Sequence, residues 1–72
     1  MNLIAACLIS VITSNSEGLI ISEQKVLTGK VTHIDKSYAT VDFSEDFQKK
    51  GYIDDWWIRS LRRDACYIRR VK

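Results

Sequence analysis

The sequence predicts one mostly β domain: a small barrel or a twisted antiparallel sheet of about five strands with one short helical turn. Three observations favour this class. Residues 3–12 form a nearly continuous apolar run that is rich in β-branched side chains. Residues 38–43 alternate strictly between apolar and polar side chains. Clusters of Ser, Asn, Asp and Gly separate the apolar runs, as is typical of short strands joined by turns.

The N-terminal segment, residues 1–13, is predicted to be a buried strand, and a short buried helix stays open because periodicity does not separate the two in such a run. A bilayer span needs about 20 apolar residues, which is longer than this run. A secretory signal begins with positive charge, and Met1-Asn2 carries none. Ile4-Ala5-Ala6-Cys7 resembles the lipobox of bacterial lipoproteins, so a membrane-anchored protein acylated at Cys7 remains an alternative. Since too few residues precede Cys7 for a full signal, we expect a strand and no membrane association.

The middle of the chain predicts a β hairpin. One strand covers residues 26–35, and its apolar positions change face, which indicates a bulge or bend near Gly29. A tight connection at 36–37 leads into the alternating strand 38–43. Residues 14–18 are a predicted turn, because Ser, Asn and Gly dominate their composition.

The C-terminal third predicts one helical turn and a closing strand. Residues 44–51 read as a polar loop or a single helical turn. A helical turn at 57–61 is expected, capped by Asp54 or Asp55, with a last strand over 65–72.

Two short patterns carry a family resemblance. These are Gly29-x-Val31-x-x-Ile34-Asp35 and Ala39-x-Val41-x-Phe43, followed by the expected turn at 57–61. With them, residues 26–71 resemble an SH3-like barrel of the KOW or Tudor kind. The resemblance implies a module that binds nucleic acid or protein segments and has no enzymatic activity. Fold alone does not fix which of these it binds.

A chain of 72 residues forms a single domain, 1–72, with a thin core. Domains of this size usually gain stability from a disulfide, a metal or a partner. Cys7 and Cys66 are the only cysteines, and neither lies in a CxxC pair or near His33 at metal-ligand spacing. We therefore expect two reduced buried thiols, no metal or cofactor, and a cytoplasmic location. Self-association is the remaining source of stability, and a homodimer through residues 3–12 is expected.

The charge distribution favours a binding surface near the C-terminus. From Arg59 to Lys72 there are six cations and one acid, whereas the remaining residues hold five lysines and eight acids. Tryptophan and tyrosine lie among these cations, and Trp, Tyr and Arg are the residue types enriched in protein-binding hot spots. We therefore expect an adaptor, inhibitor or subunit that binds a protein partner of acidic character. The predicted binding residues are Trp56, Trp57, Arg59, Arg62, Arg63, Tyr67, Arg69 and Arg70.

Two other interpretations of this segment stay open. Arginines beside flat aromatic rings also suit phosphates and unpaired bases, so a nucleic-acid-binding module is the first alternative. In the second, the tryptophans fill the core and the arginines pair with nearby acids such as Asp54, Asp55, Glu45 and Asp46.

No pattern in the chain predicts catalysis. His33 and Asp35 would share a strand face, so Asp35 could orient His33 as a general base for a Cys66 nucleophile. No further motif supports such a Cys-His-Asp arrangement. The adjacent acids Asp54 and Asp55 suit a helix cap better than a reaction centre. Three isolated glycines exclude a phosphate-binding glycine loop. We expect no catalytic residues.

Overall fold

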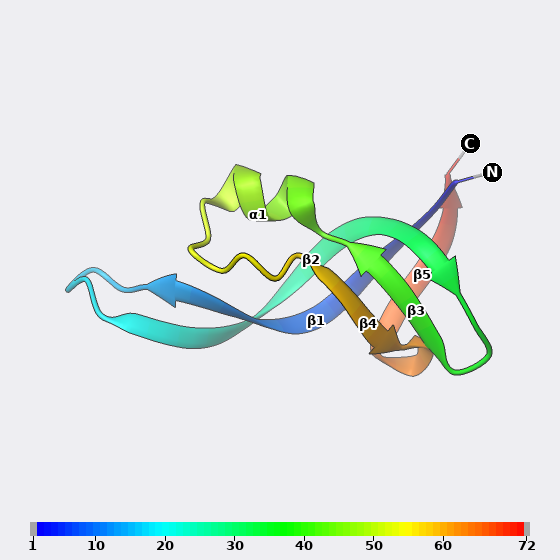
Figure 1. Cartoon of the computed structure of the whole chain (residues 1–72), viewed down its shortest axis with the longest axis horizontal. Helices are drawn as coiled ribbons and strands as arrows, with labels where there is room; N and C mark the ends of the chain where they lie inside the picture. The colour runs from blue at the N-terminus through cyan, green and yellow to red at the C-terminus, as the bar shows by residue number, and fades with distance from the viewer. Residues whose placement is uncertain (1, 72) are drawn as a thin grey trace.

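The computed structural model describes residues 2–71, which form one five-stranded antiparallel sheet with a short helix (Figure 1). The strand order is β4-β3-β2-β1-β5. The prediction of a mostly β fold with about five strands is confirmed. Within these residues no helix has the length and apolar character needed to cross a bilayer. The elements are β1 (Asn2–Ser14), β2 (Ile20–Ile34), β3 (Tyr38–Asp42), α1 (Ser44–Lys50), β4 (Ile58–Arg62), a 3-10 turn (Arg63–Ala65) and β5 (Cys66–Val71).

β1 and β2 form a long hairpin whose distal half extends to the left in Figure 1. The predicted turn at its tip is present. The Asn15 side-chain oxygen accepts hydrogen bonds from the backbone N–H groups of Glu17 and Leu19, at 2.9 and 3.0 Å. β2 is longer than expected, because the polar residues 22–25 pair with β1 and continue the strand.

The β2–β3 hairpin is confirmed. Its register shifts between Val31 and His33, beyond Gly29, near which the bulge or bend was expected. Gly29 has a separate role. A Cβ at this position would collide with the Asp42 carbonyl oxygen and the Phe43 ring. The end of β3 therefore crosses β2 at a distance that only glycine allows.

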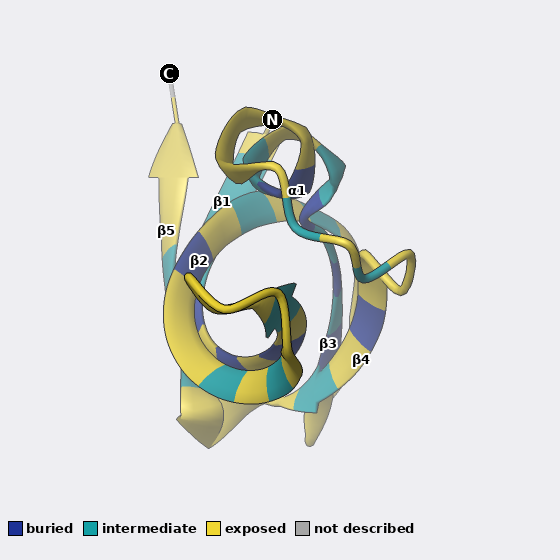
Figure 2. Cartoon of the chain, turned by 90° about the vertical axis from the view of Figure 1, so that its left-hand side faces the viewer, coloured by how far each residue is buried: buried dark blue, intermediate teal, exposed yellow. Residues whose placement is uncertain are grey.

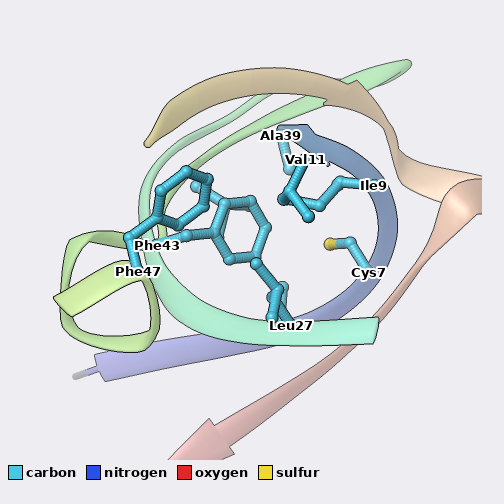
Figure 3. Close-up of a cluster of buried hydrophobic side chains, with 9 residues drawn as sticks. Cys7, Ile9, Val11, Leu27, Ala39, Phe43 and Phe47 are labelled. Atoms are coloured by element: carbon cyan, nitrogen blue, oxygen red, sulfur yellow. The ribbon is translucent and has the colours of Figure 1, made fainter. Parts of the chain in front are cut away.

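The sheet curls strongly around one hydrophobic face but is not closed into a barrel (Figure 2). Alternate residues of β1 point inward, as strand geometry requires. They meet the side chains of β2 and β3 and two phenylalanines from the segment that follows β3 (Figure 3). The buried core comprises Ala5, Cys7, Ile9, Val11, Leu27, Ala39, Val41, Phe43 and Phe47.

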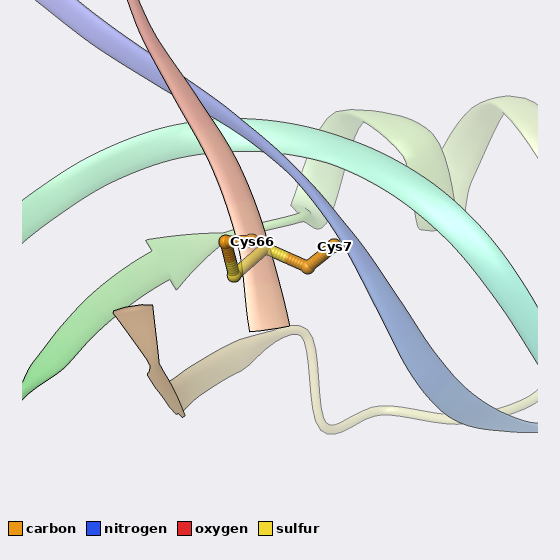
Figure 4. The surroundings of a disulfide bond; sticks show 2 residues. All are labelled: Cys7 and Cys66. Atoms are coloured by element: carbon orange, nitrogen blue, oxygen red, sulfur yellow. A yellow bond between two sulfur atoms is a disulfide. The ribbon is translucent and has the colours of Figure 1, made fainter. Parts of the chain in front are cut away.

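Cys7 and Cys66 form a disulfide, so the prediction of reduced thiols is wrong (Figure 4). The two residues lie directly opposite each other in the β1–β5 ladder, with Cα atoms 4.3 Å apart. That separation is typical of the closer, non-hydrogen-bonded pairs of an antiparallel sheet. The sequence separation of 59 hides this pairing, because it depends on the register between the first and last strands.

The expected helical turn at 57–61 is also wrong, since β4 occupies residues 58–61 and Trp57 is not in a helix. The Trp57 carbonyl accepts a hydrogen bond from the Phe43 N–H at 2.8 Å, which begins a ladder that continues through β3 and β4. The helix lies earlier, at α1, within the segment predicted as a loop or helical turn. It ends at Gly51, whose φ of 67° is the left-handed conformation typical of a helix C-terminus.

Candidate functional site

The structure separates the predicted binding residues into several places. Trp56 and Trp57 lie just before β4. Arg62 is the last residue of β4, and Arg63 begins the 3-10 turn that follows it. An extended strand of that length separates the two groups by about 16 Å. Tyr67, Arg69 and Arg70 lie on β5, at the other end of the strand order.

Arg59 lies in the interior rather than on a binding surface. It is 6% exposed, and its guanidinium packs 4.5 Å from the centre of the Trp56 ring. It donates hydrogen bonds to the Trp56 carbonyl and to Asp54 Oδ2, at 2.8 and 2.9 Å. A third bond reaches the Ser10 carbonyl on β1. The pairing with Asp54 agrees with the alternative interpretation, in which arginines pair with nearby acids, and all three guanidinium nitrogens donate within the fold.

The segment 53–58 presents large apolar side chains to solvent, and we call it the aromatic ledge. Trp56 is 63% exposed and Trp57 is 41% exposed, so the alternative in which the tryptophans fill the core is wrong. Phe43 and Phe47 fill that space instead. The exposed large side chains of the ledge are Ile53, Trp56, Trp57 and Ile58.

The backbone of the ledge is fixed by hydrogen bonds although its side chains are exposed. Asp54 Oδ1 accepts a hydrogen bond from the Trp56 N–H at 2.9 Å, and Asp54 Oδ2 accepts one from the Ile12 N–H of β1 at 3.2 Å. The Trp57 carbonyl is bound to Phe43. One face of the Trp56 indole rests on Arg59, so the exposed surface of the ring is held in position.

A second group gathers where the β2–β3 and β4–β5 connections meet. The Arg63 N–H donates to the Ser37 carbonyl at 3.0 Å, and the Arg63 side chain donates to the Asp35 carbonyl at 3.2 Å. These bonds join the two connections around an open hollow of about 440 Å³. Half of its lining residues are cations, one is an acid and one is an exposed tyrosine; the residues are Lys36, Ser37, Tyr38, Arg62, Arg63 and Asp64.

The third group lies on β5. Tyr67 is 71% exposed and pairs with Ala6 across the ladder, while Arg69 pairs with Ile4 on the same face. Arg70 pairs with Leu3 and points to the opposite face, because successive side chains of a strand alternate. All three of these β5 residues are exposed.

Sequence reasoning missed several exposed residues, two in the cationic hollow and two on the outer face of the β1–β2 hairpin. Tyr38 and Lys36 line the cationic hollow, but they were assigned only to a hairpin and its turn. Leu8 and Val26 lie directly opposite each other on the outer face of β1 and β2, and both are exposed. Their period-two placement is a sequence signal, but β1 was expected to be buried on both faces.

Two alternatives, a Cys66 nucleophile and acylation at Cys7, each need a free thiol. Cys66 is bonded to Cys7, so it offers no thiol for a Cys-His-Asp arrangement. Cys7 is 1% exposed, and the disulfide gives it a covalent role that is incompatible with acylation. In the part of the chain that the structure describes, no group of three His, Cys, Asp or Glu residues is placed to hold a metal ion.

Comparisons with protein-family models, curated proteins and solved structures found no match to this chain.

Proposed function

We propose that the protein is a non-catalytic protein-binding module, an adaptor, inhibitor or subunit, whose main contact is the aromatic ledge. The observation that carries the proposal is the exposed indole of Trp56, stacked on the buried Arg59 guanidinium. A tryptophan held rigidly at the surface loses little conformational freedom on binding. Such side chains anchor protein interfaces when a partner covers them.

The electrostatics of the ledge favour a protein over a nucleic acid. Asp54 neutralises Arg59 within the fold, at 2.9 Å, and Asp55 adds an exposed acid beside the indoles. Phosphate contacts need unpaired cations next to the stacking ring. The nearest exposed arginines, Arg62 and Arg63, lie at the far end of β4.

The test is a selection of peptides by phage display on the immobilised protein with its disulfide intact. We expect a consensus whose synthetic peptide binds the wild type and loses at least about tenfold in affinity on Trp56→Ala, the usual cost of removing a hot-spot aromatic. Leu19→Ala removes a similarly exposed large apolar side chain (58%) in the β1–β2 turn, outside every proposed binding surface, and is expected to leave this affinity unchanged. Absence of any enriched consensus, or equal binding to Trp56→Ala, would overturn the proposal.

Nucleic-acid binding is a second candidate, favoured by one observation: the hollow that combines Tyr38 with the cations Lys36, Arg62 and Arg63. Labelled single-stranded and duplex oligonucleotides, titrated at low and moderate salt, separate the two functions. Salt-sensitive binding that Arg62→Glu/Arg63→Glu abolishes and Trp56→Ala retains would place nucleic acid first.

The cysteines also bear on the compartment in which the protein acts. The cytoplasmic expectation depended on reduced thiols, and the Cys7–Cys66 disulfide removes that basis. Since disulfides persist in oxidising surroundings, we propose that the protein meets its partner in such a compartment.

A further inference from the structure

The outer edge of β5 is an unpaired strand edge with a defined hydrogen-bonding pattern. β5 is the last strand of the sheet order, and no strand among residues 2–71 pairs with its outer side. In Figure 2 no other ribbon lies beyond it. Exposed edges present N–H and C=O groups that can pair with another chain.

The geometry of β1 shows which groups of β5 are free. The Ser10 carbonyl and the Ile12 N–H bond to Arg59 and Asp54, so the even-numbered residues of β1 direct their backbone groups away from β2. Ala6 and Ile4 therefore make the ladder bonds with their partners on β5, Tyr67 and Arg69. The backbone groups of the intervening residues, Ile68 and Arg70, point to the open edge.

At two places where a neighbouring strand stops short, side chains cover the exposed backbone groups. Asp46 of α1 accepts a hydrogen bond from the Thr28 N–H at 2.9 Å, where β3 no longer pairs with β2. Arg59 and Asp54 cover β1 beyond its last pair with β5. Among the bonds between side chains and backbone in residues 2–71, none reaches Ile68 or Arg70.

We propose that the open edge of β5 binds an extended acidic peptide segment of a partner protein by antiparallel strand addition. An added strand satisfies both the N–H and the C=O of Ile68 and Arg70. A phosphate group accepts hydrogen bonds but does not donate them, so it would leave the carbonyls unpaired. The backbone pattern thus selects a peptide over a nucleic acid.

Charge selects the kind of peptide. Arg69 projects from one face of β5 and Arg70 from the other, and β5 itself contains no acid. A second copy of β5 would place arginines against arginines, and like charges opposite each other are destabilising in a sheet. An extended segment with two adjacent Asp or Glu residues would place a carboxylate beside each arginine, one on each face of the sheet. An apolar residue two positions from the acid opposite Arg69 would contact Tyr67.

The inference does not depend on the aromatic ledge, which lies on the other side of the strand order. It predicts that a labelled octapeptide, in which pairs of adjacent glutamates alternate with pairs of valines, binds the oxidised protein, with affinity measured by fluorescence anisotropy. A peptide with lysine in place of glutamate is expected not to bind. On binding, amide hydrogen exchange should slow at Ile68 and Arg70 and stay unchanged at Ser60 of β4.

A matched pair of variants isolates the backbone contact. Arg70→Ala removes only the charge, whereas Arg70→Pro also removes an N–H that β1 does not use. We expect Arg70→Pro to bind the acidic octapeptide about tenfold more weakly than Arg70→Ala, since its partner carbonyl loses a donor. If Arg70→Pro does not fold, N-methylation of alternate peptide residues tests the same bond on the wild type and should abolish binding.

Several outcomes would overturn the inference. These are equal binding of the acidic and basic octapeptides, equal binding of the N-methylated peptide, or protection of Ser60 instead of Ile68 and Arg70. If the acidic octapeptide fails while a peptide dependent on Trp56 binds, strand addition is wrong and the proposed function stands.

Discussion

Arg59 of β4 and Asp54 of the preceding loop form a buried ion pair that also joins β4 to β1. Their side chains are each 7% exposed, with 2.9 Å between Nη2 and Oδ2. The guanidinium bonds to the Ser10 carbonyl and the carboxylate to the Ile12 N–H, on the part of β1 that β5 does not reach. Side chains thus bridge the gap where the curled sheet stays open.

Loss of Arg59 should destabilise the fold severely. Arg59→Met leaves Asp54 buried without its counter-ion, for which we expect a loss of about 3–5 kcal/mol in the free energy of unfolding. The Arg62–Asp64 pair is the matched control, because its distance is similar, at 2.8 Å, but both side chains are largely exposed. Arg62→Met should cost less than about 1 kcal/mol. Urea denaturation measures both, and equal losses would contradict a structural role for Arg59.

The Cys7–Cys66 disulfide should contribute strongly to stability, because it closes a loop of 59 residues between the first and last strands. For a loop of this size the chain-entropy model gives about 4 kcal/mol. We expect Cys7→Ser/Cys66→Ser and the reduced wild type to melt at similarly lowered temperatures. Alkylation in denaturant without reductant, followed by mass spectrometry, should label neither cysteine before reduction, although unfolding exposes both positions. Labelling of both in the unreduced protein would show that the bond is absent.

The strands of the fold were largely predictable, because each depends on local patterns. Residues 38–43 alternate within a single strand, and Ser, Asn and Gly mark the turn at 14–18. The segment 57–61 was mistaken for a helical turn, because its pairing partner β3 is distant in sequence and only that pairing makes it a strand.

The candidate sites were less predictable, for the same physical reason. Composition identified the Trp and Arg residues but not their separation, since Trp56 and Arg62 lie at opposite ends of one strand. Nothing local distinguishes the buried Arg59 from the exposed Arg62. The difference comes from Asp54 and from the carbonyl of Ser10, which lies 49 positions away in the sequence.

The ion pair of Lys25 with Glu23 on β2 should be visible in a titration. The amine and carboxylate lie 3.0 Å apart, and the hydrogen bond and charge of Glu23 raise the pKa of Lys25 above its usual value of 10.5. Because the pKa of Lys25 is raised in the folded state, the stabilisation of the fold by this ion pair is fully present at neutral pH. It is lost as pH rises through the pKa of Lys25. NMR titration of the Lys25 side chain should show Glu23→Gln lowering that pKa and Glu17→Gln leaving it unchanged. An unchanged pKa in Glu23→Gln would contradict the pairing.

Gly29 and Gly51 should respond differently to the same added methyl group. At Gly29 the new Cβ meets the Asp42 carbonyl and the Phe43 ring, so β3 and the core must move. We expect Gly29→Ala to cost about 3 kcal/mol, at the upper end for an overpacked interior. At Gly51 the space is open but φ is 67°, so Gly51→Ala should cost only about 1 kcal/mol of backbone strain. Denaturant unfolding of both variants compares the two losses in the free energy of unfolding. If Gly29→Ala is no less stable than Gly51→Ala, then β3 does not cross β2 as closely as the structure places it.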